Sequence, residues 1–502
     1  MSNDTAAVEQ RAAETIWNIA DLIELQAQRR PAATALITPD RILTYRDLAV
    51  AVRAVARRLL DSGVQPGQKV GVSMMQTSLH LATLLAIARI GAVSVPVHVA
   101  LPVLQRLAIV RRYGVCAIVS GRSEFRLDKV PFIDLGSVDL AAAVQPLPAS
   151  ECRADDPFRI VFSPGTTGEP KGVMYRHGYM LARARSTIQS CMVDSHSCLL
   201  PMDLNFTAGF VYAMGTLLEG GAVVLGRIGA PGEMVHQVRT HAVTHWLLSP
   251  AIAEQVARLL VDDDIHFPSL IQLRIVGAKP GRRLLETLFA RFTPNVFEHY
   301  GSMEIGVIAV ATPALLCRVP ESAGRVVPSI TTQVVDQDDR PVLAGQSGRL
   351  RLKAPHMVDG YCGDPEKTAS RFRDGWYYTG DRARIDADGL LFLAGREDDV
   401  IDIGGGTYDP REVEQVLQAY PSVREAAAFA LLRRDGGAVL AAAVAVSARV
   451  SFDDLHAWAR ARLGAQCPVS LFAVDELPRT TTGKMRRTEV AAMFAPGSAL
   501  RT

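Results

Sequence analysis

The hydrophobic pattern of this chain alternates between short and long segments from residue 69 onward, and this alternation constrains the fold most. Short apolar segments predict strands, and the longer amphipathic segments between them predict helices. The expected strands include Val70–Met74, Val93–Val97, Ala117–Val119, Val130–Ile133, Gly221–Leu225, Thr244–Leu248 and Leu273–Val276, and the expected helices include Ser78–Arg89, Pro102–Arg112, 231–241, 250–261 and 280–292. Because such alternation builds βα units, the sequence predicts an α/β fold with mostly parallel sheets.

The pattern changes twice toward the C-terminus. From about residue 324, short β segments with Gly and Asp turns predict a small β-rich subdomain. Beyond residue 398, expected helices at Pro410–Ala419 and Phe452–Leu463 and expected strands at Ala426–Leu432 and Val439–Val446 form a compact α+β unit, which is typical of a separate domain. We therefore expect a large N-terminal lobe over residues 1–397 that includes the β-rich subdomain, and a small C-terminal lobe over residues 398–502.

The composition excludes several classes of protein. The 502 residues carry a net charge of +2, so no nucleic-acid-binding footprint is visible. The most apolar stretch, Leu81–Leu104, is interrupted by Arg89 and Pro96, whereas a membrane span needs about 20 apolar residues in succession. The seven cysteines are scattered without a CxxC pair, which argues against a zinc site or a disulfide framework. We therefore expect a cytoplasmic protein without a membrane span.

A glycine-rich segment, Ser163–Gly172, has the composition of a phosphate-binding loop. Its three glycines, two adjacent threonines and one lysine suit a backbone that turns its N–H groups around an anion. A glycine-rich turn between two strands is the alternative. The P-loop pattern places four residues between its glycines, whereas only two separate Gly165 from Gly168. The segment therefore predicts a nucleotide phosphate site that is not a P-loop.

Four distant clusters also bring a carboxylate or a lysine next to glycine. They are Tyr300–Glu304 (YGSME), Tyr377–Asp381 (YYTGD), Gly395–Asp399 (GREDD) and Pro478–Lys484 (PRTTTGK). Each could be an ordinary turn by itself. Together with the glycine-rich segment they provide an aromatic face, carboxylates and two lysines, which are the groups that a bound nucleotide requires.

These clusters resemble the adenylate-forming superfamily of acyl-CoA synthetases, aryl-acid ligases, adenylation domains and luciferases. The motifs follow the order and spacing of that superfamily, and the resemblance covers about residues 17–490. The closest likeness is to stand-alone aryl-acid AMP ligases and acid–CoA ligases. It implies an ATP- and Mg²⁺-dependent acid–thiol ligase, in which a carboxylate attacks the α-phosphate of ATP and a thiol then displaces AMP.

The resemblance also implies a nucleotide site. The residues expected to hold ATP or AMP are Ser163, Thr166, Thr167, Gly168, Lys171, Gly277, Ala278, Tyr300, Gly301, Met303, Asp381, Arg396 and Lys484. Among them, Tyr300 stacks on adenine, and Asp381 and Arg396 reach the ribose. The expected catalytic residues are Lys484, which bridges the acid and the α-phosphate, Glu304, which binds Mg²⁺, and Thr166.

By the same resemblance the small lobe rotates between the two half-reactions. Asp398 is the expected hinge, and Gly404, Gly405 and Gly406 are expected to face the thiol carrier. The chain departs from the superfamily at three positions, where Met303 replaces a threonine, Pro164 a serine or glycine, and Asp402 a frequent lysine. We expect these departures to tune the rate rather than abolish it.

The resemblance places the acid pocket in the segment Pro201–Phe210, with Asn205, Phe206, Phe210 and Lys279 as lining residues. Asn205 is neutral where amino-acid-activating members place an aspartate, and with Phe206 it matches the spacing of aryl-acid ligases. Phe206 and Phe210 would form an apolar slot for a flat ring or a short chain, unless both are ordinary core aromatics.

Two other functions stay open from the sequence. A medium- or long-chain acyl-CoA synthetase would need a pocket that extends past Phe210. A catalytically inactive homologue that binds a nucleotide or an acyl-adenylate is favoured only by Met303 and opposed by Lys484. The acceptor is expected to be CoA or the phosphopantetheine arm of a separate carrier protein.

Overall fold

The computed structural model describes residues 18–495 except 40, 143, 146, 149–151, 164–170, 192, 228–229, 261–265, 398–400, 404–405, 409, 434–437, 447–449, 465–466 and 480–484. The chain divides into two compact units, Met1–Cys317 with Ala354–Phe372 and Arg318–Lys353 with Arg373–Thr502. The second unit takes in the β-rich subdomain as well as the C-terminal residues. The lobe boundary expected near residue 398 stays a prediction.

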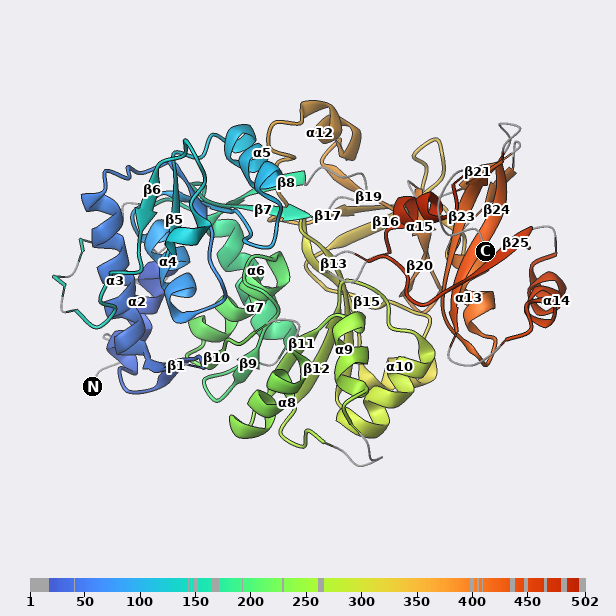
Figure 1. Cartoon of the computed structure of the whole chain (residues 1–502), viewed down its shortest axis with the longest axis horizontal. Coiled ribbons are helices and arrows are strands. Elements are labelled where there is room, and N and C mark those ends of the chain that lie inside the picture. The colour runs from blue at the N-terminus through green and yellow to red at the C-terminus, as the bar shows by residue number, and fades with distance from the viewer. Residues whose placement is uncertain are drawn as a thin grey trace. The chain divides into compact units, whose positions relative to one another are not determined.

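One sheet of the first unit contains the two strands that flank the glycine-rich segment (Figure 1). In order its strands are β6 (Phe132–Asp134), β5 (Ala117–Ser120), β3 (Lys69–Val72), β4 (Val93–Pro96), β7 (Pro157–Ser163) and β8 (Lys171–Arg176). Neighbouring strands are parallel except β7 and β8, which pair antiparallel with Ser163 opposite Lys171. The backbone therefore brings the two ends of the glycine-rich segment side by side.

A second sheet of this unit carries the Tyr300–Glu304 cluster. In order its strands are β14 (Gly306–Ala311), β13 (Val296–Ser302), β12 (Gln272–Val276), β11 (His245–Leu248), β9 (Cys198–Leu200), β10 (Ala222–Val224), β1 (Thr34–Ile37) and β2 (Ile42–Thr44). Its inner strands are parallel, and β2 and β14 pair antiparallel with β1 and β13 respectively. The predicted mostly parallel α/β architecture is confirmed in both sheets.

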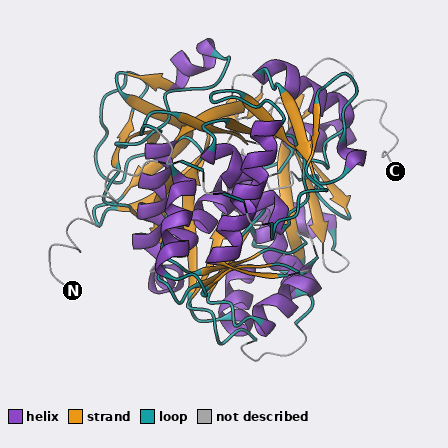
Figure 2. Ribbon diagram, turned by 90° about the vertical axis from the view of Figure 1, so that its left-hand side faces the viewer, coloured by secondary structure: helices purple, strands orange, loops and turns teal. Residues whose placement is uncertain are grey.

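Helices of the first unit lie between the two sheets (Figure 2). α4 (Ser78–Arg89) contacts β3, β4 and β7, whereas α7 (Thr207–Leu218) contacts β9 and β10. α2 (Ile19–Arg29) contacts both α4 and α7, and α6 (His177–Cys191) packs on α7. Nearly every residue of α4 and α7 is buried, as expected for helices covered on all sides. This helix layer separates the two sheets.

The first unit also contains other helices. They are α3 (Tyr45–Asp61), α5 (Val103–Tyr113), α8 (Pro231–Thr240), α9 (Pro250–Ala257), α10 (Arg282–Thr287), α11 (Pro313–Arg318, at the boundary between the units) and α12 (Pro365–Arg371). The N-terminus of α3 has a capping box, because the Thr44 side chain accepts from the Asp47 N–H and the Asp47 carboxylate accepts from the Thr44 N–H.

The second unit contains an antiparallel sheet followed by a small α+β region. The antiparallel strands, in order, are β16 (Thr331–Val335), β17 (Gly348–Lys353), β19 (Trp376–Ile385), β20 (Leu390–Arg396) and β15 (Gly324–Val326). The α+β region contains β21 (Ile401–Ile403), β22 (Gly406–Tyr408), α13 (Pro410–Gln418), β23 (Val423–Leu432), β24 (Ala438–Val446), α14 (Phe452–Leu463), β25 (Ser470–Val474) and α15 (Arg487–Met493). The sequence predicted α14 at these bounds and the other long elements to within a few residues.

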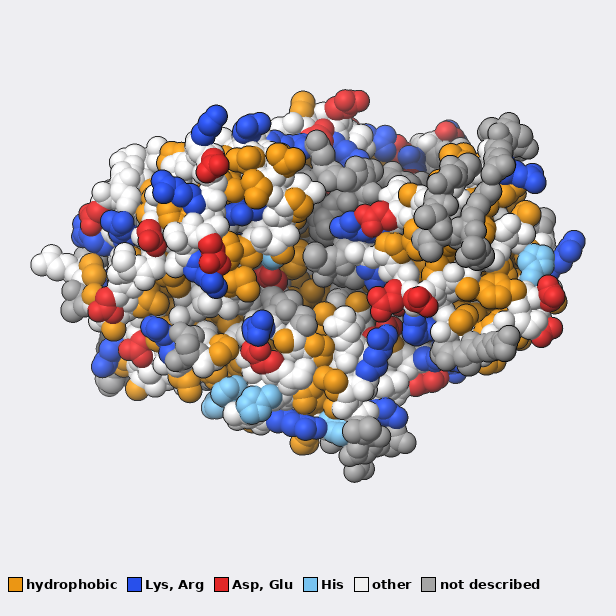
Figure 3. Space-filling view, in the orientation of Figure 1, with side chains coloured by type: hydrophobic (Ala, Val, Ile, Leu, Met, Phe, Trp, Pro, Cys, Tyr) orange, Lys and Arg blue, Asp and Glu red, His pale blue; other side chains and the backbone are white. Residues whose placement is uncertain are grey.

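The surface carries charges of both signs. Figure 3 shows Lys and Arg side chains interspersed with Asp and Glu side chains on the face drawn, as the net charge of +2 predicts. None of the helices in the described part of the chain is long and apolar enough to cross a membrane.

Candidate active site

The Glu304 carboxylate, the expected Mg²⁺ ligand, is held by a buried tyrosine. The Tyr361 hydroxyl donates a hydrogen bond to Glu304 Oε1 at 2.7 Å. The Glu304 backbone carbonyl accepts from the Tyr179 hydroxyl at 2.8 Å and from the Val358 N–H at 3.1 Å. Glu304 and Tyr361 are both buried, so these bonds fix the position of the carboxylate with little competition from water.

The residue before Glu304 is held by side chains from β8 and α6. The Met303 carbonyl accepts from the Tyr175 hydroxyl at 2.8 Å and from Arg183 Nη2 at 2.9 Å. Arg183 also lies over the Tyr179 ring, with Cζ 4.2 Å from the ring centroid. The Met303 side chain is buried in the hydrophobic core of the unit. This departure from the superfamily therefore adds core packing in place of a hydroxyl.

The sequence did not indicate Tyr175, Tyr179, Arg183 or Tyr361 as site residues. They lie outside the glycine-containing clusters, and Tyr361 is separated from Glu304 by 57 positions. A buried arginine and several tyrosines in one chain are equally compatible with ordinary core packing. Only the backbone path that brings β8, α6 and residues 354–372 together makes them neighbours of Glu304.

The expected adenine-binding residues lie on two neighbouring strands. β12 and β13 are parallel with Val276 opposite His299, so Gly277 and Ala278 at the end of β12 lie beside Tyr300 on β13. Gly277 has a φ of +89°, which favours glycine. A Cβ on Gly301 would lie 2.4 Å from the Gly306 carbonyl oxygen, so only glycine fits there. The structure thus brings these expected residues together.

Lys279, expected in the acid pocket, pairs with a buried carboxylate that the sequence did not indicate. Lys279 Nζ lies 3.7 Å from Glu298 Oε2. Burial raises the pKa of the Glu298 carboxyl to about 7, and the nearby Lys279 ammonium opposes part of that rise. Glu298 therefore changes charge near neutral pH, two positions before Tyr300 on the same strand.

This raised pKa predicts a pH-dependent stability. Between pH 4.5 and about 7 the unfolded chain ionises Glu298 while the folded chain keeps it protonated, so the folded state is progressively destabilised as pH rises. In Glu298→Gln we expect a smaller loss of unfolding free energy from pH 5 to pH 7.5, measured by urea denaturation. Glu286→Gln, at an exposed carboxylate paired with Arg282, is the matched control. An unchanged slope in Glu298→Gln would contradict the raised pKa.

The two expected ribose-binding residues meet in the second unit. Asp381 on β19 is opposite Arg396 on β20, and Arg396 Nε lies 3.6 Å from Asp381 Oδ1. The Asp381 N–H also donates to the Thr379 hydroxyl at 2.9 Å. A carboxylate so placed offers two acceptor oxygens, as adjacent ribose hydroxyls require.

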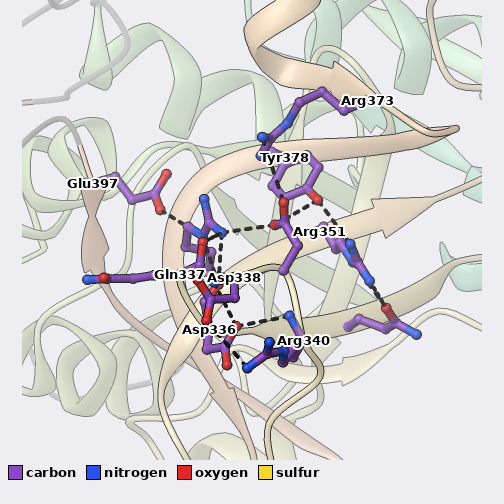
Figure 4. A network of polar contacts seen from close by, with 11 residues as sticks. Asp336, Gln337, Asp338, Arg340, Arg351, Arg373, Tyr378 and Glu397 are labelled. Carbon is purple, nitrogen blue, oxygen red and sulfur yellow. Dashed lines mark hydrogen bonds and ion pairs between the residues drawn. The ribbon is translucent and has the colours of Figure 1, made fainter.

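A polar network anchors the residue that precedes the expected hinge (Figure 4). Glu397 Oε1 lies 3.8 Å from Arg349 Nε. Arg349 Nη2 in turn donates to the Asp336 carbonyl at 2.8 Å and to Asp339 Oδ1 at 2.9 Å. Tyr378 donates to the same Asp339 oxygen at 2.9 Å. The Glu397 side chain therefore lies at the margin of this network, and the hinge role of Asp398 stays a prediction.

Three of the expected acid-pocket residues, Asn205, Phe206 and Phe210, lie at or near the N-terminus of α7. The buried Asn205 donates from Nδ2 to Asp203 Oδ1 at 2.9 Å, and Asp203 Oδ2 lies 3.1 Å from His98 Nε2. Phe206 precedes the first turn of α7, and Phe210 is buried within the helix layer. Phe210 is 1% exposed, as the alternative role of a core aromatic requires, and the guanidinium of Arg159 lies against its ring. The apolar slot therefore stays a prediction.

Several expected site residues lie outside the described part of the chain. They are Pro164, Thr166, Thr167, Gly168, Asp398, Gly404, Gly405 and Lys484. The side chains of Ser163 and Asp402 also lie outside the description. Lys171 is described at the start of β8. The roles of these residues stay predictions.

Comparisons with known proteins agree with this geometry. The "AMP-binding enzyme" family matches residues 23–362, and the "AMP-binding enzyme C-terminal domain" family matches residues 412–484. A feruloyl-CoA synthase from an Amycolatopsis species is 31% identical over 93% of this chain and 97% of its own length. A salicylyl-CoA synthase / salicylate adenylyltransferase from a Streptomyces species is 30% identical over 90% of this chain and 89% of its own length.

Solved structures share the fold over most of the chain. The amide bond synthetase McbA from Marinactinospora thermotolerans has a TM-score of 0.85 at 25% identity, covering 95% of this chain and all of that one. The o-succinylbenzoate CoA synthetase from Bacillus subtilis has a TM-score of 0.84 at 23% identity, covering 93% of this chain and 97% of that one.

The fold and the family matches define an enzyme that activates carboxylic acids as adenylates. The chain belongs to the AMP-binding enzyme family. The predicted α/β fold class and the predicted activity, AMP-forming acid–thiol ligation that depends on ATP, are confirmed at this level.

Proposed function

We propose that this chain activates a small aryl or short unsaturated carboxylic acid with ATP and Mg²⁺ and passes the acyl group to a thiol. A carboxylate oxygen forms a bond to the α-phosphorus of ATP while the bond to pyrophosphate breaks. The thiolate of CoA, or of a carrier-protein phosphopantetheine arm, then attacks the acyl carbon, and AMP leaves with the carboxylate oxygen that it gained.

The observation that carries the choice of acid is the buried, neutral Asn205 beside the aromatic Phe206 and Phe210. An uncharged amide does not pair with an α-ammonium group, whereas aromatic side chains favour a flat ring. The relatives named above, a feruloyl-CoA synthase and a salicylyl-CoA synthase, support the same substrate class.

The residues present suit magnesium. Mg²⁺ prefers oxygen ligands and, in nucleotide enzymes, usually takes one or two carboxylates together with substrate phosphates. Glu304 supplies such a carboxylate at a position fixed by Tyr361. When bound there, Mg²⁺ would neutralise phosphate charge, while Lys171 and Lys484 are the residues proposed to contact the phosphates themselves.

Acid-dependent ATP–pyrophosphate exchange tests this function most directly. We expect exchange with at least one benzoate, hydroxybenzoate or cinnamate, at a kcat/KM at least about 10-fold above that of octanoate, because a short aromatic-lined pocket does not fit a long chain. Exchange only with medium- or long-chain acids would favour the rival acyl-CoA synthetase. Absence of exchange with every acid would favour the inactive homologue. Mass spectrometry of products formed with CoA and with a phosphopantetheinylated carrier protein would then identify the acceptor.

A further inference from the structure

The helix layer next to the proposed acid pocket contains a fully buried guanidinium. Arg159 lies on β7 and is 1% exposed. Its Cζ is 4.4 Å from the centroid of the Phe210 ring, and its Nη2 donates to the Leu204 carbonyl at 2.6 Å. Leu204 immediately precedes Asn205, so Arg159 contacts two parts of the segment that is expected to bind the acid.

Arg159 is incompletely paired. Its Nε and Nη1 atoms have no hydrogen-bond partner among the described residues. The pKa of Arg159 is lowered by burial only to about 10, so the group is charged at neutral pH. A buried guanidinium has five N–H donors, and leaving donors unpaired costs free energy comparable to lost hydrogen bonds.

The neighbouring polar groups do not supply the missing acceptor. Asp203, the carboxylate that faces this cluster, already accepts from Asn205 through Oδ1 and contacts His98 through Oδ2. His80 on α4 is fully buried, and both of its ring nitrogens lack hydrogen-bond partners in the described part of the chain. Burial lowers the pKa of His80 to about 4, so its ring is neutral at pH 7.

The side chains of this cluster differ in exposure. Arg159 and His80 are the buried members, Asp203 is nearly buried, and the His98 side chain is 28% exposed. The positive charge of Arg159 and the negative charge of Asp203 add up to zero. A ligand group that completes this cluster should therefore offer oxygen lone pairs without adding a charge.

We propose that Arg159 is a specificity-determining residue that donates hydrogen bonds to a neutral oxygen acceptor on the acid, away from its reacting carboxylate. This inference rests on the proposed function and narrows its substrate class to aryl acids with a carbonyl or ether substituent. In this proposal Phe210 contacts the aryl ring of the acid. Arg159, which lies over the face of the Phe210 ring, binds the substituent oxygen of the acid. His80 completes the same polar end of the pocket.

Near-isosteric acids test this inference. Pyrophosphate exchange is measured for acetylbenzoates and isopropylbenzoates, which differ in a carbonyl oxygen, as the 2-, 3- and 4-isomers. We expect the kcat/KM ratio of acetyl to isopropyl acid to exceed about 10 for at least one isomer. In Arg159→Met that ratio should fall by about 10-fold or more, while exchange with the isopropyl acid is retained.

Arg274→Met is the matched control, because Arg274 is also fully buried and lies over the ring of Tyr212 on α7. It should leave the ratio unchanged. Arg159→Lys should restore part of the preference. An equal loss with both acids in Arg159→Met would assign Arg159 a structural role and overturn the inference.

If the variants do not fold, the kcat/KM ratios of the wild-type protein still test the inference. Ratios near one for all three isomers in the wild type would overturn the inference by themselves. If isopropylbenzoates support exchange but the ratio is insensitive to Arg159, only this inference fails. If no aryl acid supports exchange, the proposed function fails with it. A preference for a dicarboxylate over the acetyl acids would contradict the neutral acceptor proposed here.

Discussion

Lys484→Ala is expected to abolish most acyl-adenylate formation while leaving thioester formation from a preformed acyl-adenylate nearly intact. The first step brings a carboxylate and a triphosphate to bonding distance, and a lysine ammonium between two anions removes their repulsion. Loss of one such electrostatic contact typically costs about 10²–10³-fold in rate. Pyrophosphate exchange measures the first step, and release of AMP from a synthetic acyl-adenylate on addition of CoA measures the second.

Lys129→Ala is the control, since Lys129 is an exposed lysine in a turn. It should retain both half-reactions. The expected role of Lys484 would be rejected by equal losses in the two half-reactions, or by a variant that exchanges pyrophosphate at the wild-type rate.

Glu304→Gln is expected to reduce pyrophosphate exchange by about 100-fold or more and to raise the Mg²⁺ concentration needed for half-maximal rate. The substitution keeps the shape of the side chain and removes the negative charge that a divalent ion requires. Charge stabilisation by a bound metal ion contributes several kcal/mol to such transition states, so its loss has a large effect. Titration of Mg²⁺ at saturating ATP, together with nucleotide binding in the presence and absence of Mg²⁺, measures both quantities.

Tyr361→Phe provides a graded comparison in the same assay. It removes only the 2.7 Å hydrogen bond to Glu304 Oε1 and keeps the ring. We expect a rate loss of about 10-fold, since a hydrogen bond to a charged group is worth about 1.5–3 kcal/mol, and a shift of the Mg²⁺ requirement in the same direction. A rate loss without any change in Mg²⁺ requirement, in both variants, would contradict the metal-binding role of Glu304.

The fold was largely predictable because its signals are local. The period of the hydrophobic pattern predicted α4 at Ser78–Arg89 and α14 at Phe452–Leu463 at the observed bounds. The sequence analysis missed α6 and α7. α7 is buried on all sides, so it has no polar face, and its apolar run could equally be a strand.

The site was predictable only in part. The motifs indicated Asp381 and Arg396, and the register of β19 and β20 places these two residues opposite each other, while their contact with ribose stays a prediction. The partners of Glu304, Lys279 and Phe210, which are Tyr361, Glu298 and Arg159, carried no signal. Each is one residue of a common type at a large separation along the chain.

The amino-acid sequence by itself determined the family, the order of strands and helices, and the types of group available for a nucleotide and an acid. These depend on local spacing and periodicity, which are visible in the sequence without any coordinates. Tertiary structure alone decided which buried groups face those residues. It thereby raises the pKa of Glu298 to about 7 and leaves Arg159 with donors that have no partner among the described residues. Desolvation and hydrogen-bond pairing depend on neighbours from distant segments, and only the packed chain brings those segments together.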